Sequence, residues 1–360
     1  MAQKIPATVI TGFLGSGKTT LIRNLLAQNH GKRIALIINE FGDIGIDGEV
    51  LKGCGDAACA EEDIVELSNG CICCTVADDF IPTMTALIER DAPPDHIVIE
   101  TSGLALPQPL VRAFNWPEIR TRVTVDGVIT VVDGPATAEG RFAHDVAAVD
   151  AQRVADGALD HETPLSELFE DQIACADMIV ISKTDAMEHV LAETLLDTLS
   201  RDSRSGVHVL RSTVEGLAPQ VLLGLGIGSE QDMDVRHEVH HHHDDAGGDH
   251  HGLEHEHGHD EFENFIVDLG EVPDAVCFAE RLAEVIRAHD ILRLKGFVAV
   301  AGKPMRLVVQ AVGPRIETYY DQPFPGAERQ TRLVVIGEAG LDRAAIANAL
   351  ADGVAVAAAE

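Results

Sequence analysis

The 360-residue chain is long enough for two domains, and its 46 % apolar and 24 % charged residues are typical of a globular protein. Its formal net charge of −32 argues against binding to nucleic-acid phosphates or to an anionic membrane, and suits a surface that attracts cations. The sequence shows neither a signal-peptide pattern nor a run of about 18 apolar residues, so we expect a cytoplasmic protein with no membrane partner.

Six short β-branched runs recur through the first two-thirds of the chain and predict strands. They lack strict polar alternation, as strands buried on both faces of a parallel sheet do. Helical patterns separate them, for example at residues 20–28 and 191–199. This alternation predicts an α/β fold with a doubly wound, mostly parallel sheet. The runs cover residues 8–10, 34–38, 97–99, 128–132, 178–181 and 207–210.

The first predicted strand leads into residues 12–19 (GFLGSGKT), which fit the phosphate-loop template G-x-x-x-x-G-K-[ST] between a strand and a helix. In this template the backbone N–H groups and the helix N-terminus hold the phosphates. We expect Lys18 to reach the β- and γ-phosphates and the Thr19 hydroxyl to ligate Mg²⁺. The residues predicted to bind nucleotide here are Gly12, Gly15, Ser16, Gly17, Lys18, Thr19 and Thr20.

A cysteine cluster follows at residues 70–74 (GCICC). In an extended chain Cys71 and Cys73 face one way and Cys74 the other. Two or three thiolates can then converge on one Zn²⁺, Co²⁺ or Cu⁺ ion. We therefore predict a metal site at these three cysteines; a redox pair or buried structural thiols are the alternatives.

The cysteine cluster lies between the phosphate loop and the third predicted strand, where nucleotide-sensing switch segments usually lie. If the γ-phosphate and Mg²⁺ order this segment, metal affinity becomes nucleotide-dependent. Residues 39–47 (NEFGDIGID) are glycine-rich and acidic, and Glu40 is a candidate oxygen ligand or water-positioning residue, unless they form an ordinary solvated loop. Of the other cysteines, Cys54 and Cys59 have no assigned role, and we interpret Cys175 and Cys277 as core residues.

The third predicted strand ends in residues 97–103 (IVIETSG). Glu100 emerges at its carboxyl end, where ligands of open α/β sheets bind, so we expect it in the Mg²⁺ shell. Gly103 would let a backbone N–H approach the γ-phosphate. Asp133, at the end of the next strand, is a weaker candidate of the same kind, and a turn-forming aspartate is the alternative for it.

Residues 182–185 (SKTD) close the fifth strand and differ by one residue from the N-K-x-D guanine motif. Asp185 can accept hydrogen bonds from both N1 and N2 of guanine, which adenine cannot offer, and the Lys183 stem can cover the base. Because paired hydrogen bonds discriminate steeply, we expect guanine to be preferred. Ser182 replaces the usual Asn, and a simple strand-ending turn is the alternative.

The composition changes near residue 229. Residues 229–263 consist mainly of His, Asp, Glu and Gly, which predicts a flexible linker between a GTPase domain at 1–228 and a C-terminal domain at 264–360. The C-terminal pattern predicts a small α+β domain, with strands near residues 265–267, 296–300, 305–311 and 331–336 and helices at 276–288 and 342–350.

Ten of the 17 His residues fall between His237 and His259, interleaved with Asp and Glu. Neutral imidazoles and carboxylates bind divalent transition metals. We expect weak, multi-site metal capture by this tract without discrimination among ions; a linker that is merely rich in His is the alternative.

These segments together resemble the CobW family of P-loop GTPases, which is related to the nickel-insertion GTPases of urease and hydrogenase. The matching stretches are residues 11–20, 39–47, 70–75 (GCICCT), 100–103 (ETSG) and 182–185, followed by a His-rich linker and a small C-terminal domain. The resemblance implies GTP hydrolysis coupled to metal delivery. It implies that Lys18 and Thr19 serve phosphate and Mg²⁺, Glu100 the Mg²⁺ shell, Lys183 and Asp185 guanine, and Cys71, Cys73 and Cys74 the metal.

The leading hypothesis is a GTP-hydrolysing metallochaperone that delivers a metal to a client enzyme. The layout with its long His tract resembles the family members associated with cobalt supply to the cobaltochelatase of cobalamin synthesis, so we expect Co²⁺ and that client. Zinc allocation to a zinc enzyme is an alternative, because thiolates suit both ions. A metal-storage protein with a purely structural nucleotide site is an alternative of a different class.

Overall fold

The computed structural model describes residues 4–28, 31–38, 64–66, 80–155, 164–213, 216–236, 262–313, 315–324, 329–338 and 340–352. The chain divides into two compact units, Met1–Glu254 and His255–Glu360. No helix among the described residues is long and apolar enough to cross a bilayer.

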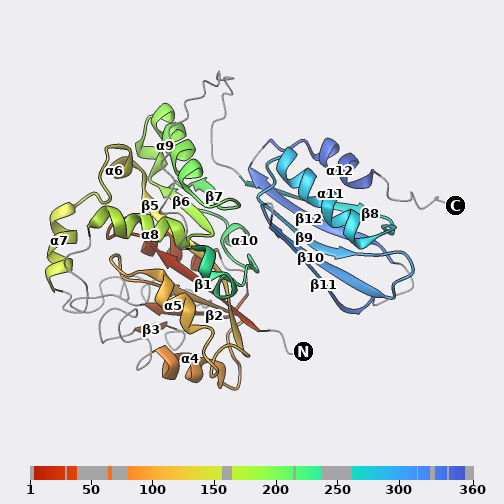
Figure 1. The fold of residues 1–360 in the computed structure, drawn as a ribbon, viewed down its shortest axis with the longest axis horizontal. Coiled ribbons are helices and arrows are strands. Elements are labelled where there is room, and N and C mark those ends of the chain that lie inside the picture. Colours follow the sequence, from red (N-terminus) through yellow and green to blue (C-terminus); the bar gives the residue numbers. More distant parts are fainter. Residues whose placement is uncertain are drawn as a thin grey trace. The chain divides into compact units, whose positions relative to one another are not determined.

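In its described residues the first unit is built on a seven-stranded sheet of order β3-β2-β4-β1-β5-β6-β7 (Figure 1). Neighbouring strands all pair in parallel. The predicted doubly wound parallel sheet is therefore confirmed, and only the short edge strand β3 was not predicted. The strands are β1 Ile5–Thr11, β2 Ile34–Ile38, β3 Ile64–Glu66, β4 His96–Glu100, β5 Val123–Asp133, β6 Met178–Ser182 and β7 His208–Arg211.

Both faces of this sheet are covered, because every residue of β2 and β4 is buried. Helices α4 (Ile81–Ile88) and α5 (Pro107–Ala113) add side chains such as Met84 and Leu110 to a core with the central strands. Helices α8 (Leu165–Cys175) and α9 (His189–Asp202) pack in the same way near β6 and β7. The remaining helices are α1 Lys18–Ala27, α6 Gly134–Ala138, α7 Val146–Ala155 and α10 Pro219–Leu222.

The start of the predicted linker at residue 229 is wrong. Ser229–Gln231 and Met233–Arg236 are short 3-10 helices that belong to the first unit. The buried Glu230 carboxylate accepts hydrogen bonds from the Thr124 hydroxyl at 2.6 Å and the Val125 N–H at 2.9 Å. Hydrogen bonds from polar residues hold this segment in place. Its polar composition therefore resembles that of a linker. The His-rich tract itself lies outside the described residues.

The second unit, in its described residues, carries a five-stranded antiparallel sheet of order β11-β10-β9-β12-β8 with two helices. Its core gathers Leu282 of α11, Leu350 of α12 and strand residues such as Val309 and Val335. The predicted small α+β domain is confirmed, with β11 as the strand that was not predicted. The elements are β8 Phe262–Leu269, α11 Ala275–Ala288, β9 Arg293–Val298, β10 Met305–Val312, β11 Arg315–Pro323, β12 Thr331–Glu338 and α12 Arg343–Ala351.

The two described cysteines differ from each other in burial. Cys175 is buried as predicted, and burial raises the pKa of its thiol to about 12. The prediction of a core position for Cys277 is wrong, because its side chain is exposed. The apolar face of α11 is formed instead by Phe278 and the residues one turn and two turns further along, so Cys277 falls outside this face.

Candidate nucleotide-binding site

The carboxyl ends of four parallel strands bring the predicted site residues to one edge of the sheet. The phosphate loop follows β1, Glu100 ends β4, Asp133 ends β5 and Ser182 ends β6. Strand β1 pairs with β4 on one side and β5 on the other. Ligands of open α/β sheets bind at this edge, so the topology itself creates the site.

Three glycines give the phosphate loop its shape. Gly12, Gly15 and Gly17 have φ values of 134°, 74° and 101°, in the left-handed region that disfavours other residues. A Cβ atom at Gly12 would also lie 2.1 Å from the Val131 carbonyl oxygen. Helix α1 then begins at Lys18, so its first N–H groups point toward the loop.

The Lys18 side chain lies within the curve of the loop. Its Nζ atom donates hydrogen bonds to the carbonyl oxygens of Gly12 at 2.7 Å and Phe13 at 3.2 Å. Only 7 % of Lys18 is exposed. A buried cation held by backbone carbonyls at the start of a helix provides a preformed site for a phosphate group.

Thr19 and Glu100 join helix α1 to strand β4. The Thr19 hydroxyl donates a hydrogen bond of 3.0 Å to Oε1 of Glu100, whose side chain is buried. A hydroxyl and a carboxylate that meet beside a phosphate loop are the hard oxygen ligands that Mg²⁺ prefers. The chemistry of these two residues therefore fits a magnesium ion, and their role as its ligands stays a prediction.

The loop after β4 approaches the phosphate loop closely at Gly103. A Cβ atom on Gly103 would lie 2.6 Å from the backbone nitrogen of Leu14, so this contact requires glycine. Buried Gln172 of α8 holds the same loop, because its Nε2 donates to the carbonyls of Gly103 at 3.1 Å and Ala105 at 3.3 Å. The sequence analysis did not predict a role for Gln172, because this residue belongs to none of the recognised motifs.

Lys183 links the predicted base-binding segment to the phosphate loop. Its Nζ donates to the Gly15 carbonyl at 2.7 Å and pairs with Oδ2 of Asp133 at 2.5 Å. The other carboxylate oxygen of Asp133 accepts the Ala136 N–H at 3.0 Å and caps α6. Asp133 therefore has the alternative role considered for it, that of a turn-forming residue. Its carboxylate forms an ion pair with Lys183.

The other two residues predicted to bind the base, Ser182 and Asp185, lie on either side of Lys183 in the chain. The Ser182 hydroxyl lies 2.5 Å from the Ser16 carbonyl and 3.1 Å from the Val132 carbonyl, so this segment is tied directly to the phosphate loop. Asp185 lies in the 3-10 helix Thr184–Ala186 and is exposed. Its carboxylate is thus available to a ligand in solution.

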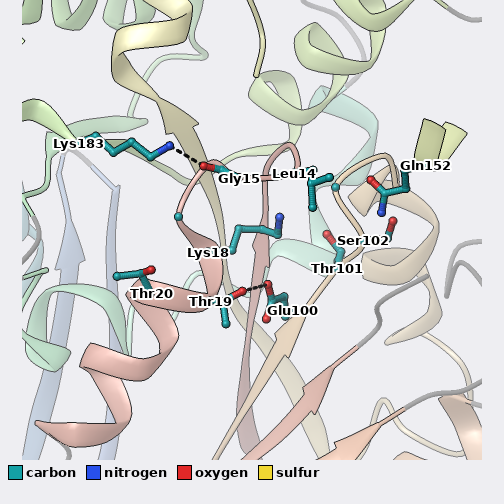
Figure 2. A pocket seen from close by; sticks show the side chains of 12 residues that line it. Leu14, Gly15, Lys18, Thr19, Thr20, Glu100, Thr101, Ser102, Gln152 and Lys183 are labelled. Carbon is teal, nitrogen blue, oxygen red and sulfur yellow. Dashed lines mark hydrogen bonds between the residues drawn. The ribbon is translucent and has the colours of Figure 1, made fainter. Parts of the chain in front are cut away.

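A cavity of about 380 Å³ opens between these groups (Figure 2). Its lining includes Gln152 of α7, which the sequence did not indicate, and eight predicted residues: Gly15, Gly17, Lys18, Thr19, Thr20, Glu100, Gly103 and Lys183. Gly12, Ser16, Ser182 and Asp185 are not among its lining residues. The full lining is Leu14, Gly15, Gly17, Lys18, Thr19, Thr20, Glu100, Thr101, Ser102, Gly103, Gln152 and Lys183.

The predicted transition-metal ligands lie outside the described residues. This applies to Cys71, Cys73 and Cys74, to Glu40, to Cys54 and Cys59, and to the histidines between His237 and His259. Their roles stay predictions from the sequence.

Comparison with known proteins assigns both units. Residues 6–211 match the model of the CobW/HypB/UreG nucleotide-binding domain, and residues 264–354 match that of the cobalamin synthesis protein cobW C-terminal domain. A protein named zinc chaperone CobW from a Sinorhizobium species is 59 % identical over 353 residues, covering 96 % of each chain.

Two further relatives carry similar names. The zinc chaperone CobW of Pseudomonas aeruginosa is 50 % identical over 352 residues, which cover 96 % of this chain and 91 % of that one. The zinc chaperone YjiA of Escherichia coli is 30 % identical over 342 residues, which cover 92 % and 94 % of the two chains.

Proposed function

The chain belongs to the CobW/HypB/UreG family of nucleotide-binding proteins, and from this membership we propose that it is a GTP-hydrolysing metal chaperone. The observation that carries the proposal is the group of Lys18, Thr19 and Glu100 around one cavity. A cation within a phosphate loop and two oxygen ligands beside it are what phosphoryl transfer from a nucleoside triphosphate requires.

The chemistry of the cavity follows from its charges. Water attacks the γ-phosphorus, the bond to the oxygen that bridges the β- and γ-phosphates breaks, and GDP and phosphate leave. Lys18 donates to phosphate oxygens in place of its present carbonyl partners and neutralises the charge that moves to the leaving group. Thr19 and Glu100 would hold Mg²⁺, which supplies further charge neutralisation.

The base-binding segment supports guanine as the preferred base. Asp185 is exposed, and the nearby Lys183 donates a hydrogen bond to the Gly15 carbonyl, so the segment has a set position relative to the phosphate loop. A carboxylate at this place accepts two hydrogen bonds from guanine and repels the ring nitrogen that adenine presents there.

The cargo metal is assigned to the thiolates of Cys71, Cys73 and Cys74, on the sequence alone. Thiolate ligands suit both Zn²⁺ and Co²⁺. We propose Zn²⁺, because relatives at 59 % and 50 % identity are named zinc chaperones. Cobalt delivery to a cobaltochelatase, which the sequence pattern favoured, is the alternative, and the client stays a prediction.

The proposal is tested by GTP turnover of the full chain with Mg²⁺. Lys18→Ala should lower kcat/KM by roughly 100-fold or more, since it removes a charge that acts on the transition state. Lys32→Ala is the matched control, because Lys32 is exposed and does not line the cavity. If the wild-type chain shows no turnover, or if Lys18→Ala leaves turnover unchanged, the proposed GTPase activity is wrong.

A further inference from the structure

One end of the nucleotide cavity presents polar atoms that lack partners. Oε1 of Gln152 and Oγ of Ser102 are buried and have no hydrogen-bond partner in the part of the chain that the structure describes. Both residues line the cavity. A buried polar atom without a hydrogen-bond partner destabilises a fold, so two such atoms in one cavity indicate that they bind a polar ligand or water.

The position of this pair in the cavity indicates what it faces. Figure 2 shows Gln152 and Ser102 at one end of the cavity and Lys183, beside the base-binding segment, at the other, with Lys18 between them. A nucleotide whose base lies near Lys183 and whose phosphates lie on Lys18 has its last phosphate at the Gln152 end. Gly103, which touches the phosphate loop at Leu14, lies at this end too.

Helix α7 holds Gln152 in place. Val149 is fully buried in a cluster with Phe13 of the phosphate loop and Leu104 of the loop after β4. Gln152 follows Val149 by three residues, so both side chains lie on the same face of the helix. The packing of Val149 therefore directs Gln152 toward the cavity and fixes its distance from the phosphate loop.

We propose that Gln152 positions the water molecule that attacks the γ-phosphate of GTP. The inference rests on the proposed GTPase function, which assigned no residue to position the attacking water. The amide oxygen accepts a hydrogen bond from the water, and the amide N–H₂ can donate to a phosphate oxygen, which aligns the water with the γ-phosphorus.

The amide orients the water and takes no proton. The water oxygen forms a bond to phosphorus while the bond between phosphorus and the bridging oxygen breaks, and GDP leaves. The proton of the water passes to an oxygen of the released phosphate. The buried hydroxyl of Ser102 supplies a second hydrogen bond to the same water or to the phosphate.

The test compares single-site variants of the full chain in GTP hydrolysis and in binding of a non-hydrolysable GTP analogue. Gln152→Ala should lower kcat by about 100-fold, the scale for one interaction made mainly in the transition state, while the analogue's Kd changes less than about twofold. Gln152→Glu keeps the size and packing of the side chain but puts a negative charge beside the γ-phosphate, so its kcat should fall as well.

Asp150→Ala is the matched control, because Asp150 lies on the same helix and is exposed to solvent. Its kcat and analogue affinity should equal those of the wild type. Binding of GDP with aluminium fluoride, which mimics the transferring phosphoryl group, should weaken in parallel with kcat in both Gln152 variants and not in the control.

Three results overturn the inference. Unchanged kcat in both Gln152 variants would show that the water is positioned elsewhere. Equal losses in kcat/KM and in analogue affinity would show a contact with bound GTP that does not act on the transition state. A wild-type chain that binds GTP but does not hydrolyse it would remove the proposed function and this inference together, which separates that failure from the first two.

Discussion

At the scale of single residues, we predict that the Asp185 carboxylate selects the base that the site accepts. Guanine presents N–H groups at N1 and N2, and both oxygens of Asp185 can accept them. An amide at this position has one acceptor and one donor group, which matches xanthine, because xanthine carries an oxygen where guanine carries its amino group. The exposed position of Asp185 means that the substitution disturbs no packing.

Asp185→Asn should therefore weaken GTP binding by roughly 100-fold and strengthen binding of xanthosine triphosphate. Competition titrations with the two triphosphates measure both effects. Asp197→Asn on α9 is a suitable control, since Asp197 is also exposed and lies away from the cavity. An unchanged order of preference in Asp185→Asn would show that this loop does not bind the base.

The residues of the cavity differ in how well the sequence predicts them. Lys18 and Thr19 come from a template in which spacing along the chain determines position in space, Glu100 comes from the end of a strand in a parallel sheet, and the structure brings the three to one cavity. Gln152 and Gln172 come from helices distant in sequence, and only the packing of α7 and α8 brings them to this edge of the sheet. A motif of closely spaced residues therefore cannot predict such contacts.

At the scale of elements, a buried ion pair holds Met233–Arg236, the last described segment of the first unit, in place. Arg236 is fully buried; its guanidinium donates to the Cys175 carbonyl at 2.5 Å and to Asp177 at 2.8 Å. Asp177 also accepts the Val128 N–H at 2.9 Å. Burial alone would lower the pKa of Arg236, but the Asp177 carboxylate raises the pKa above its ordinary value, so the arginine stays charged.

Arg236→Ala should lower the free energy of unfolding of the first unit by about 3 kcal/mol, because it leaves the buried Asp177 charge with weaker compensation. Urea denaturation of the full chain, followed by a signal from the first unit, measures this loss. Arg201→Ala, at an exposed position of α9, should change stability by less than about 0.5 kcal/mol. A loss no larger than that of the control would mean that the ion pair does not fasten the segment.

The sequence predicted those helices and strands whose pattern of apolar residues matches the burial seen in the structure. Strand β2 is apolar throughout and β4 is apolar between its two end residues, and both matched the prediction within a few residues, since both of their faces are covered. The missed strand β11 is an edge strand with many polar residues (RIETYYDQP), so its composition resembles a loop. The 3-10 helices of residues 229–236 were missed because charged residues anchor them.

At the scale of the whole molecule, we propose that a nucleotide site is coupled to a metal site. The described residues provide the first of these, with a cavity that Gly103, Gln152 and Lys18 surround. The second is a prediction from the sequence, in which the cysteine cluster lies between β3 and α4, before the strand that ends at Glu100. A net charge of −32 attracts divalent cations to the surface in general but cannot select among them.

A chaperone must hold its metal in one state and release it in another. If the triphosphate orders the thiolates, the two binding equilibria are linked, and each ligand changes the affinity of the other by the same factor. Couplings of this kind are typically about 1–3 kcal/mol, or roughly 5- to 150-fold in affinity. A metal-storage protein with a structural nucleotide site would show no such link.

The most direct test is the Zn²⁺ affinity of the full chain with Mg²⁺, measured with a non-hydrolysable GTP analogue and again with GDP, using a competing chelator. Cys73→Ser controls for weak binding by the His tract, and repeating the titration with Co²⁺ gives the ion preference. We predict a Zn²⁺ affinity at least about fivefold higher with the GTP analogue, and loss of that difference in Cys73→Ser. Equal Zn²⁺ affinity in the two nucleotide states of the wild-type chain would contradict the account.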